Sequence, residues 1–176
     1  FFIATNSYAQ FVQQGTKLVG AGTIGQFSYQ GRATAISGDG NTMIVGGYRD
    51  NNFIGAAWIY IRQGNTWVQQ GNKLIPNDNI GQARFGVSAS LSYDGNTLII
   101  GGTGDNAYSG AAWIFTRNNN IWSQKQKLTM LDPAGDQQYF GQSVSIAADG
   151  NTAIIGANQD NTTYGAACIF NQSNGS

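Results

Sequence analysis

The sequence repeats itself about every 55 residues, and this repeat limits the possible folds more than any other feature. An Asp-Gly-Asn-Thr run at residues 39–42 returns at 94–97 and at 149–152. A Gly-Ala-Ala-Trp-Ile run at residues 55–59 returns at 110–114 and, with Cys in place of Trp, at 165–169. Each copy should therefore be one small structural unit that buries its apolar faces against its neighbours. We divide the chain into residues 1–10, residues 11–30, repeat 1 at 31–85, repeat 2 at 86–140 and an incomplete repeat 3 at 141–176.

The second copy predicts four short β-strands. Val87, Ala89 and Leu91 alternate with serines, which is the period of a strand. The turn at residues 94–96 leads into the apolar run 98–102, which suits a strand covered on both faces. Residues 111–115 and 121–128 supply the third and fourth strands. Four antiparallel strands per repeat, without a helical pattern, predict an all-β fold of β-propeller blades. A β-helix or another solenoid is the alternative.

The repeats resemble the FG-GAP repeats of integrin-like β-propellers, and in particular those of bacterial secreted repeat proteins. Phe-Gly pairs stand at 85–86 and 140–141, and Gly101-Gly102 and Gly156-Ala157 lie near the place of the Gly-Ala element. The first copy departs from this pattern with Gln30-Gly31. The resemblance implies a secreted or cell-surface protein that binds proteins or glycans. Integrin-type blades often carry a calcium loop rich in Asp, but nothing here matches it, so we expect no bound cation.

The charged residues are few and lack the types that catalysis normally uses. The chain has no His and no Glu, its nine acidic residues are all Asp, and nine Lys and Arg balance them. Only Asp136 has no counterpart in another repeat. Since general bases, metal ligands and nucleophiles of the usual kinds are missing, we expect no enzyme activity and no cofactor. The zero net charge argues against nucleic-acid binding, and no apolar run is long enough for membrane insertion.

Two sets of repeated residues are candidates for ligand binding. An Asp-Asn pair recurs in the loop before the Gly-Ala-Ala run, where it either braces the loop or lines a ligand-binding face. Four Trp residues either pack in the core or offer flat platforms to sugar rings. Cys168 replaces one of these Trp residues, either as a half-buried apolar side chain or as a reactive thiol. The candidate residues are Asp50, Asn51, Asp105, Asn106, Asp160, Asn161, Trp58, Trp113, Trp67 and Trp122.

These observations favour a non-catalytic, secreted or cell-surface module for adhesion, protein binding or assembly. A glycan-binding, lectin-like propeller is the first alternative, and an accessory domain of a larger extracellular enzyme is the second. Residues 1–9 resemble either the tail of a signal peptide or a first strand.

The chain also predicts self-association. Residues 11–18 correspond to the fourth strand of a blade, whereas the third copy stops after Phe170, before its own fourth strand. Three blades are too few to close a ring. We therefore expect residues 11–18 of one molecule to fill the vacancy in another, which gives a six-bladed ring of two chains or a filament. Alternatively, the chain is a fragment and neighbouring repeats supply the missing blades.

Overall fold

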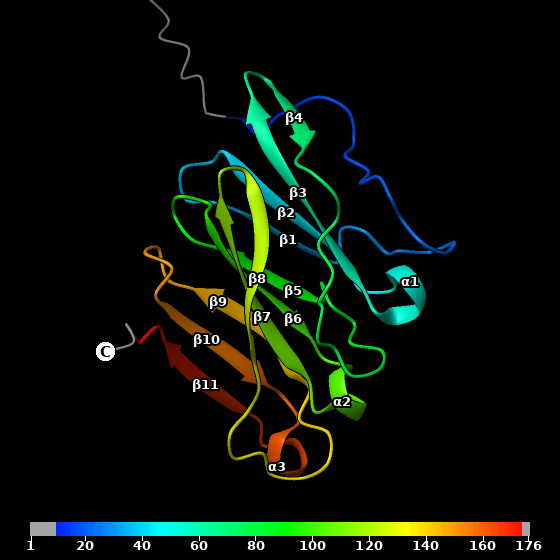
Figure 1. The fold of residues 1–176 in the computed structure, drawn as a ribbon, viewed down its shortest axis with the longest axis vertical. Helices are drawn as coiled ribbons and strands as arrows, with labels where there is room; N and C mark the ends of the chain where they lie inside the picture. Colours follow the sequence, from blue (N-terminus) through cyan, green and yellow to red (C-terminus); the bar gives the residue numbers. More distant parts are fainter. Residues whose placement is uncertain (1–9, 174–176) are drawn as a thin grey trace, which may run out of the picture.

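A computed structural model describes residues 10–173, and these residues form an all-β structure of three antiparallel sheets (Figure 1). The four strands predicted for the second copy are confirmed, and the expectations for residues 1–9 lie outside the described residues. The first sheet contains β1 (Ala33–Ile36), β2 (Thr42–Gly47), β3 (Ala56–Gln63) and β4 (Thr66–Gln69). The second contains β5 (Ser88–Leu91), β6 (Thr97–Gly102), β7 (Ala111–Asn118) and β8 (Ile121–Leu128). The third contains β9 (Phe140–Ile146), β10 (Thr152–Ala157) and β11 (Ala166–Asn171).

The Asp-Gly-Asn turns join the first and second strands of each sheet, as the sequence predicts. In the second sheet the Asp94 carboxylate accepts hydrogen bonds from the backbone N–H of Asn96 at 3.0 Å and from the Ser92 hydroxyl at 2.6 Å. Gly95 has a φ of 63°, a conformation that glycine adopts without strain. The turn Asp residues therefore have the structural role that their spacing predicts.

The second and third strands of each sheet are joined by a single tight turn. These turns are α1 (Asp50–Phe53), α2 (Asp105–Tyr108) and α3 (Asp160–Thr163), and they follow one edge of the molecule in Figure 1. Their second and third residues have left-handed backbone, with φ of 48° at Asn51 and 53° at Asn52 in α1. Asn tolerates this conformation better than most residues, which accounts for the Asn that follows each Asp.

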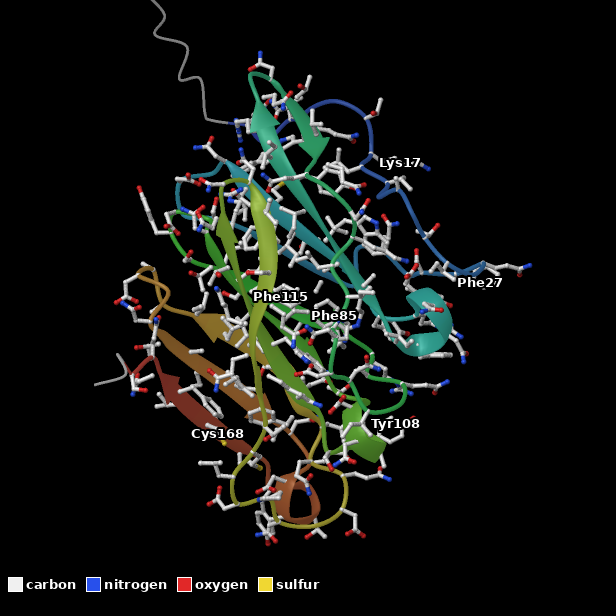
Figure 2. The ribbon with its side chains drawn as sticks, viewed as in Figure 1. Lys17, Phe27, Phe85, Tyr108, Phe115 and Cys168 are labelled. Carbon is white, nitrogen blue, oxygen red and sulfur yellow. The ribbon has the colours of Figure 1, made fainter. Side chains whose placement is uncertain are left out.

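The sheets stack face to face like the blades of a propeller. The first shared core joins Ile44 and Ile59 of the first blade to Phe85, Trp113 and Phe115 of the second (Figure 2). A similar core joins the second blade to the third around Phe140. Each Phe of a Phe-Gly pair therefore packs in the core between its blade and the preceding one.

The paired glycines allow two blades to approach backbone to backbone. A Cβ atom at Gly46 would lie 2.2 Å from the carbonyl oxygen of Gly86, and one at Gly101 would lie 2.0 Å from that of Gly141. The predicted close approach is therefore confirmed. Its partner is the Phe-Gly pair that opens the next blade.

The third blade is open on its far face. Ile154 and Ile169 are 45% and 67% exposed there. Their counterparts in the first blade, Ile44 and Ile59, are completely buried. The same kind of face is thus covered between blades one and two, and uncovered at the end of the three-blade arc.

Segment 11–18, which is predicted to pair as an outer strand with another molecule, is not a strand in the single chain. Residues 11–18 have no strand hydrogen bonds here, and Phe11 and Val12 are exposed. A strand needs a neighbouring edge to satisfy its backbone groups, and none of the three sheets within residues 10–173 pairs with this segment, so the expected intermolecular pairing stays a prediction.

Candidate functional site

The repeated Asp-Asn pair clamps the loop that leads into each blade. The Asp50 carboxylate accepts a hydrogen bond from the backbone N–H of Ile24 at 2.8 Å, and the Asn51 N–H donates to the carbonyl oxygen of the same residue at 2.9 Å. The same pair of bonds joins Asp105 and Asn106 to Ile80, and joins Asp160 and Asn161 to Ala134. The Asp side chains are buried. This geometry supports the interpretation that the Asp-Asn pair braces its loop. Of the six residues in the three pairs, only the Asn side chains are placed to contact a ligand.

Two of these Asp-Asn clamps have a lysine partner from an outer strand or the residues after it. Lys73 forms an ion pair with Asp50, and Lys127 forms one with Asp105 at 2.7 Å. Asp160 forms no ion pair within residues 10–173. The third blade has no described outer strand to bring a lysine to it.

The proposed sugar platforms at Trp58 and Trp113 are wrong, because both side chains are completely buried. The Trp58 indole N–H donates to the carbonyl oxygen of Ala21 at 2.7 Å, and that of Trp113 donates to the Asp78 carboxylate at 2.7 Å. Each indole therefore fixes the loop that covers it. No face of either ring is free to stack on a ligand.

Trp67 and Trp122 are half-buried on the outer strands, and each has an arginine over its ring. The guanidinium of Arg62 lies 4.8 Å from the ring centroid of Trp67, and that of Arg117 lies 5.2 Å from Trp122. Burial lowers the pKa of Arg117, while the nearby carboxylates of Asp39 and Asp94 raise it. Because arginines cover these rings, their position favours packing between outer strands over sugar stacking.

The outer edge of β11 is open and borders a groove. Within residues 10–173, β11 pairs with β10 on one side only. The adjacent groove is lined by Ile114 and Leu128 of the second blade and by Ala153 and Phe170 of the third. An open strand edge beside an apolar groove is suited to accept another strand.

Segment 11–18 resembles the fourth strands that pair at the equivalent edge in the first and second blades. Six of its eight residues are identical to those at 67–74, where β4 completes the first blade. Its side-chain contacts match as well. Gln14 accepts a hydrogen bond from the Trp67 indole at 3.3 Å, just as Gln70 accepts one from Trp122 at 2.9 Å. The segment therefore already lies where the outer strand of a preceding blade would lie.

Sequence reasoning missed a set of stacked aromatic and arginine side chains beside α1 and α2. It comprises Tyr29, Arg49, Phe53, Arg84, Tyr108 and Tyr139, and we call it the aromatic–arginine strip. The available signal was the residue before each Phe-Gly or Gln-Gly pair, which is Tyr29, Arg84 or Tyr139. All three have a φ of 54° or 55°.

Cys168 is half-buried against the core between the second and third blades. Burial raises the pKa of its thiol, and the nearby carboxylates of Asp132 and Asp160 raise it further. A raised pKa leaves little reactive thiolate at neutral pH. The apolar packing role is therefore the one that this environment supports.

Within the described part of the chain, no three Cys or Asp side chains gather as a metal site would require. No helix between residues 10 and 173 is long and apolar enough to cross a membrane.

The fold and the glycine contacts between sheets define a class, the β-propeller proteins. The sequence profile of the FG-GAP repeat matches residues 67–115 and 122–170, which is more than half of the chain. The chain therefore belongs to the FG-GAP repeat family, as the Phe-Gly pairs predict. A search of curated proteins found no match.

Solved structures agree on the fold. Hydrazine synthase of Kuenenia stuttgartiensis aligns with a TM-score of 0.52 at 12% identity, over 89% of this chain and 36% of that one. Sqt1 of Saccharomyces cerevisiae aligns with a TM-score of 0.53 at 12% identity, over 86% of this chain and 34% of that one. Both are β-propeller proteins. The chain thus spans about a third of each.

Proposed function

We propose that the chain is a non-catalytic extracellular module that works in assembly and protein binding by joining its open third blade to the first blade of another copy. The observation that carries this proposal is the match between segment 11–18 and the outer strand of the first blade, in sequence and in the contacts of Gln14. Pairing this segment with β11 would satisfy an open strand edge on one molecule and an unpaired segment on the other.

The register of the joined blade follows from the first one. There Tyr60 pairs with Gln69 and Arg62 pairs with Trp67. At the equivalent positions of the repeat, Phe170 would pair with Gln13 of a second copy. The ring of Phe11 would then enter the groove beside Phe170, and the exposed Ile154 and Ile169 would pack on the first blade of that copy.

Light scattering on the 176-residue chain tests this proposal. We expect a mass of about twice 18.7 kDa, or a series of larger multiples if the head-to-tail contact does not close. Deletion of residues 1–18 should give a monomer. A folded monomer of the undeleted chain at micromolar concentration would contradict the proposal.

Glycan binding is the second candidate function, and one observation favours it. The buried Trp58 and Trp113 no longer support it, but the aromatic–arginine strip offers partly exposed rings at the surface. Binding of the chain to a panel of immobilised polysaccharides tests this candidate.

A further inference from the structure

The strip alternates aromatic rings with guanidinium groups across neighbouring blades. The guanidinium carbon of Arg49 lies 4.6 Å from the ring centroids of both Tyr29 and Phe53. That of Arg84 lies 5.8 Å from Phe53 and 4.7 Å from Tyr108. The guanidinium groups of Arg49 and Arg84 therefore both lie near the ring of Phe53. Arg49 follows β2 of the first blade, and Arg84 precedes β5 of the second blade.

The strip continues toward the third blade and lies at the surface. The rings of Tyr108 and Tyr139 lie 5.3 Å apart and are inclined by 31°. Tyr108 lies at the α2 edge of the molecule, away from the central Phe85 and Phe115 (Figure 2). Tyr29 is 50% exposed at the other end. A ligand could therefore meet several of these side chains along one edge.

The two arginines keep unused hydrogen-bond donors. Arg84 donates one hydrogen bond to the Tyr108 hydroxyl at 2.9 Å. The Arg49 side chain donates none to residues 10–173, and neither arginine forms an ion pair there. Stacking fixes the plane of a guanidinium but leaves its N–H edge free, and this edge matches the two oxygens of a carboxylate.

We propose that the aromatic–arginine strip binds an acidic polysaccharide built from uronic acid units. Sugar rings would stack on Tyr29 and on the exposed edges of the other rings, and the uronate carboxylates would bind the N–H edges of Arg49 and Arg84. This inference rests on the second candidate function and adds the class of glycan. It also gives a role to Arg49 and Arg84, which form no ion pair within residues 10–173.

Titration of the 176-residue chain with polygalacturonate, followed by calorimetry, tests the inference. The matched probe is the fully methyl-esterified polymer, in which the same sugar backbone carries no free carboxylate. We expect polygalacturonate to bind at least about tenfold more tightly than its methyl ester. Arg49→Gln and Arg84→Gln should each weaken this binding by about tenfold.

Three controls show whether the uronate binds at the strip and through its arginine donors. Arg62→Gln removes another arginine stacked on an aromatic ring, Trp67, and should leave the affinity unchanged. Arg49→Lys keeps the charge but loses the planar donor edge, so it should weaken binding nearly as much as Arg49→Gln. Single-stranded DNA of equal charge is the control for general anion binding, because its phosphates can also pair with arginines. Its charges lie between the sugars and not on the sugar rings, so it should bind at least about tenfold more weakly than polygalacturonate if the strip recognises uronate units.

The outcomes distinguish the inference from the candidate function on which it rests. Polygalacturonate and its ester could bind equally well, with no effect of the Arg49 and Arg84 variants. That result would be consistent with glycan binding but would overturn the uronate site. Failure of polygalacturonate to bind, or equally tight binding of DNA, would also overturn it. Unchanged melting temperatures confirm that a loss of affinity in the variants does not come from unfolding.

Discussion

At the scale of single residues, the repeat preserves the groups that fix turns and loops. The turn Asp residues bind backbone N–H groups, and the loop Asp residues are buried in the Asp-Asn clamp. Both roles need a short side chain with two acceptor oxygens. This explains why Asp occurs so regularly in a chain that lacks Glu.

Ser92→Ala should lower stability by an amount that depends on pH. The hydrogen bond from Ser92, together with that from Asn96, lowers the pKa of Asp94 below its ordinary value. A lowered pKa in the folded state stabilises the protein above the pKa of the unfolded state, and this contribution is lost as pH falls through the folded pKa. We expect a loss of about 1 kcal/mol at pH 7, which shrinks below about pH 4.

Chemical denaturation of both proteins at pH 7 and pH 3 measures the effect. Part of the loss should persist at pH 3, because the Ser92 hydroxyl also accepts a hydrogen bond from Thr97 N–H at 3.0 Å. The third repeat has Ala147 at this position, so Ala147→Ser is the converse variant. An equal loss at both pH values would show that the carboxylate is not involved.

Thr162→Asn should stabilise the chain. Thr162 has a φ of 54° and a ψ of 46°, which is left-handed backbone, and its equivalent in the first repeat is Asn52. A β-branched residue is strained in this conformation, and Asn is tolerated better. We expect a gain of about 0.5–1 kcal/mol in thermal or chemical unfolding. Thr162→Val is the control and should give no gain.

At the scale of strands and blades, the period of two, the turn sequences and the paired glycines predicted the four strands of the second blade and the close approach at Gly101. They do not determine whether residues 11–18 form a strand, since that depends on a neighbouring edge and not on local preference. Nor could they predict which side of a strand is buried. Trp58 and Trp113 are buried because covering loops reach their indoles, and sequence spacing does not reveal those loops.

Gly101→Ala and Gly156→Ala should differ sharply, although the two glycines are equivalent in the repeat. A Cβ at Gly101 would meet the Gly141 backbone, which cannot move without separating two blades. A Cβ at Gly156 would meet only the Ser143 hydroxyl at 2.4 Å, which can rotate away. We expect a loss of about 1–3 kcal/mol for Gly101→Ala and little change for Gly156→Ala in the monomeric chain lacking residues 1–18.

The same comparison in the full chain reports on the third blade. If the first blade of another copy covers the third blade, Gly156 acquires a backbone neighbour like that of Gly101. Gly156→Ala should then weaken association. Similar losses for both variants in the monomer would mean that the two glycine sites have the same surroundings.

At the scale of the whole molecule, the two ends of the blade arc are complementary. The third blade presents an open edge, an apolar groove and Asp160, whose two equivalents each pair with a lysine. The front of the chain presents segment 11–18, in which Lys17 occupies the position of Lys73 in the first blade. Joining the ends would therefore supply the lysine for which Asp160 has no partner within residues 10–173.

A charge exchange between these ends tests the proposed assembly directly. In the joined form Lys17 of one copy would pair with Asp160 of the next, as Lys73 pairs with Asp50. Lys17→Asp would place two carboxylates together, and Asp160→Lys would place two ammonium groups together, so either change alone should weaken association. We expect each to raise the dissociation constant by at least about tenfold, measured by light scattering or sedimentation over a range of concentrations.

The double variant Lys17→Asp, Asp160→Lys restores an opposite-charge pair and should recover most of the lost affinity. Arg84→Asp makes the same change of net charge and is the matched control, because Arg84 lies at the junction of the first and second blades, has no ion-pair partner in the described structure and does not line the groove beside β11. Asp160 also accepts the Ala134 N–H, so Asp160→Lys carries a separate cost in stability that the double variant would not remove. If the double variant associates again despite this loss of stability, residues 17 and 160 of neighbouring copies are in contact. Association that ignores both single changes would place the contact elsewhere on the arc.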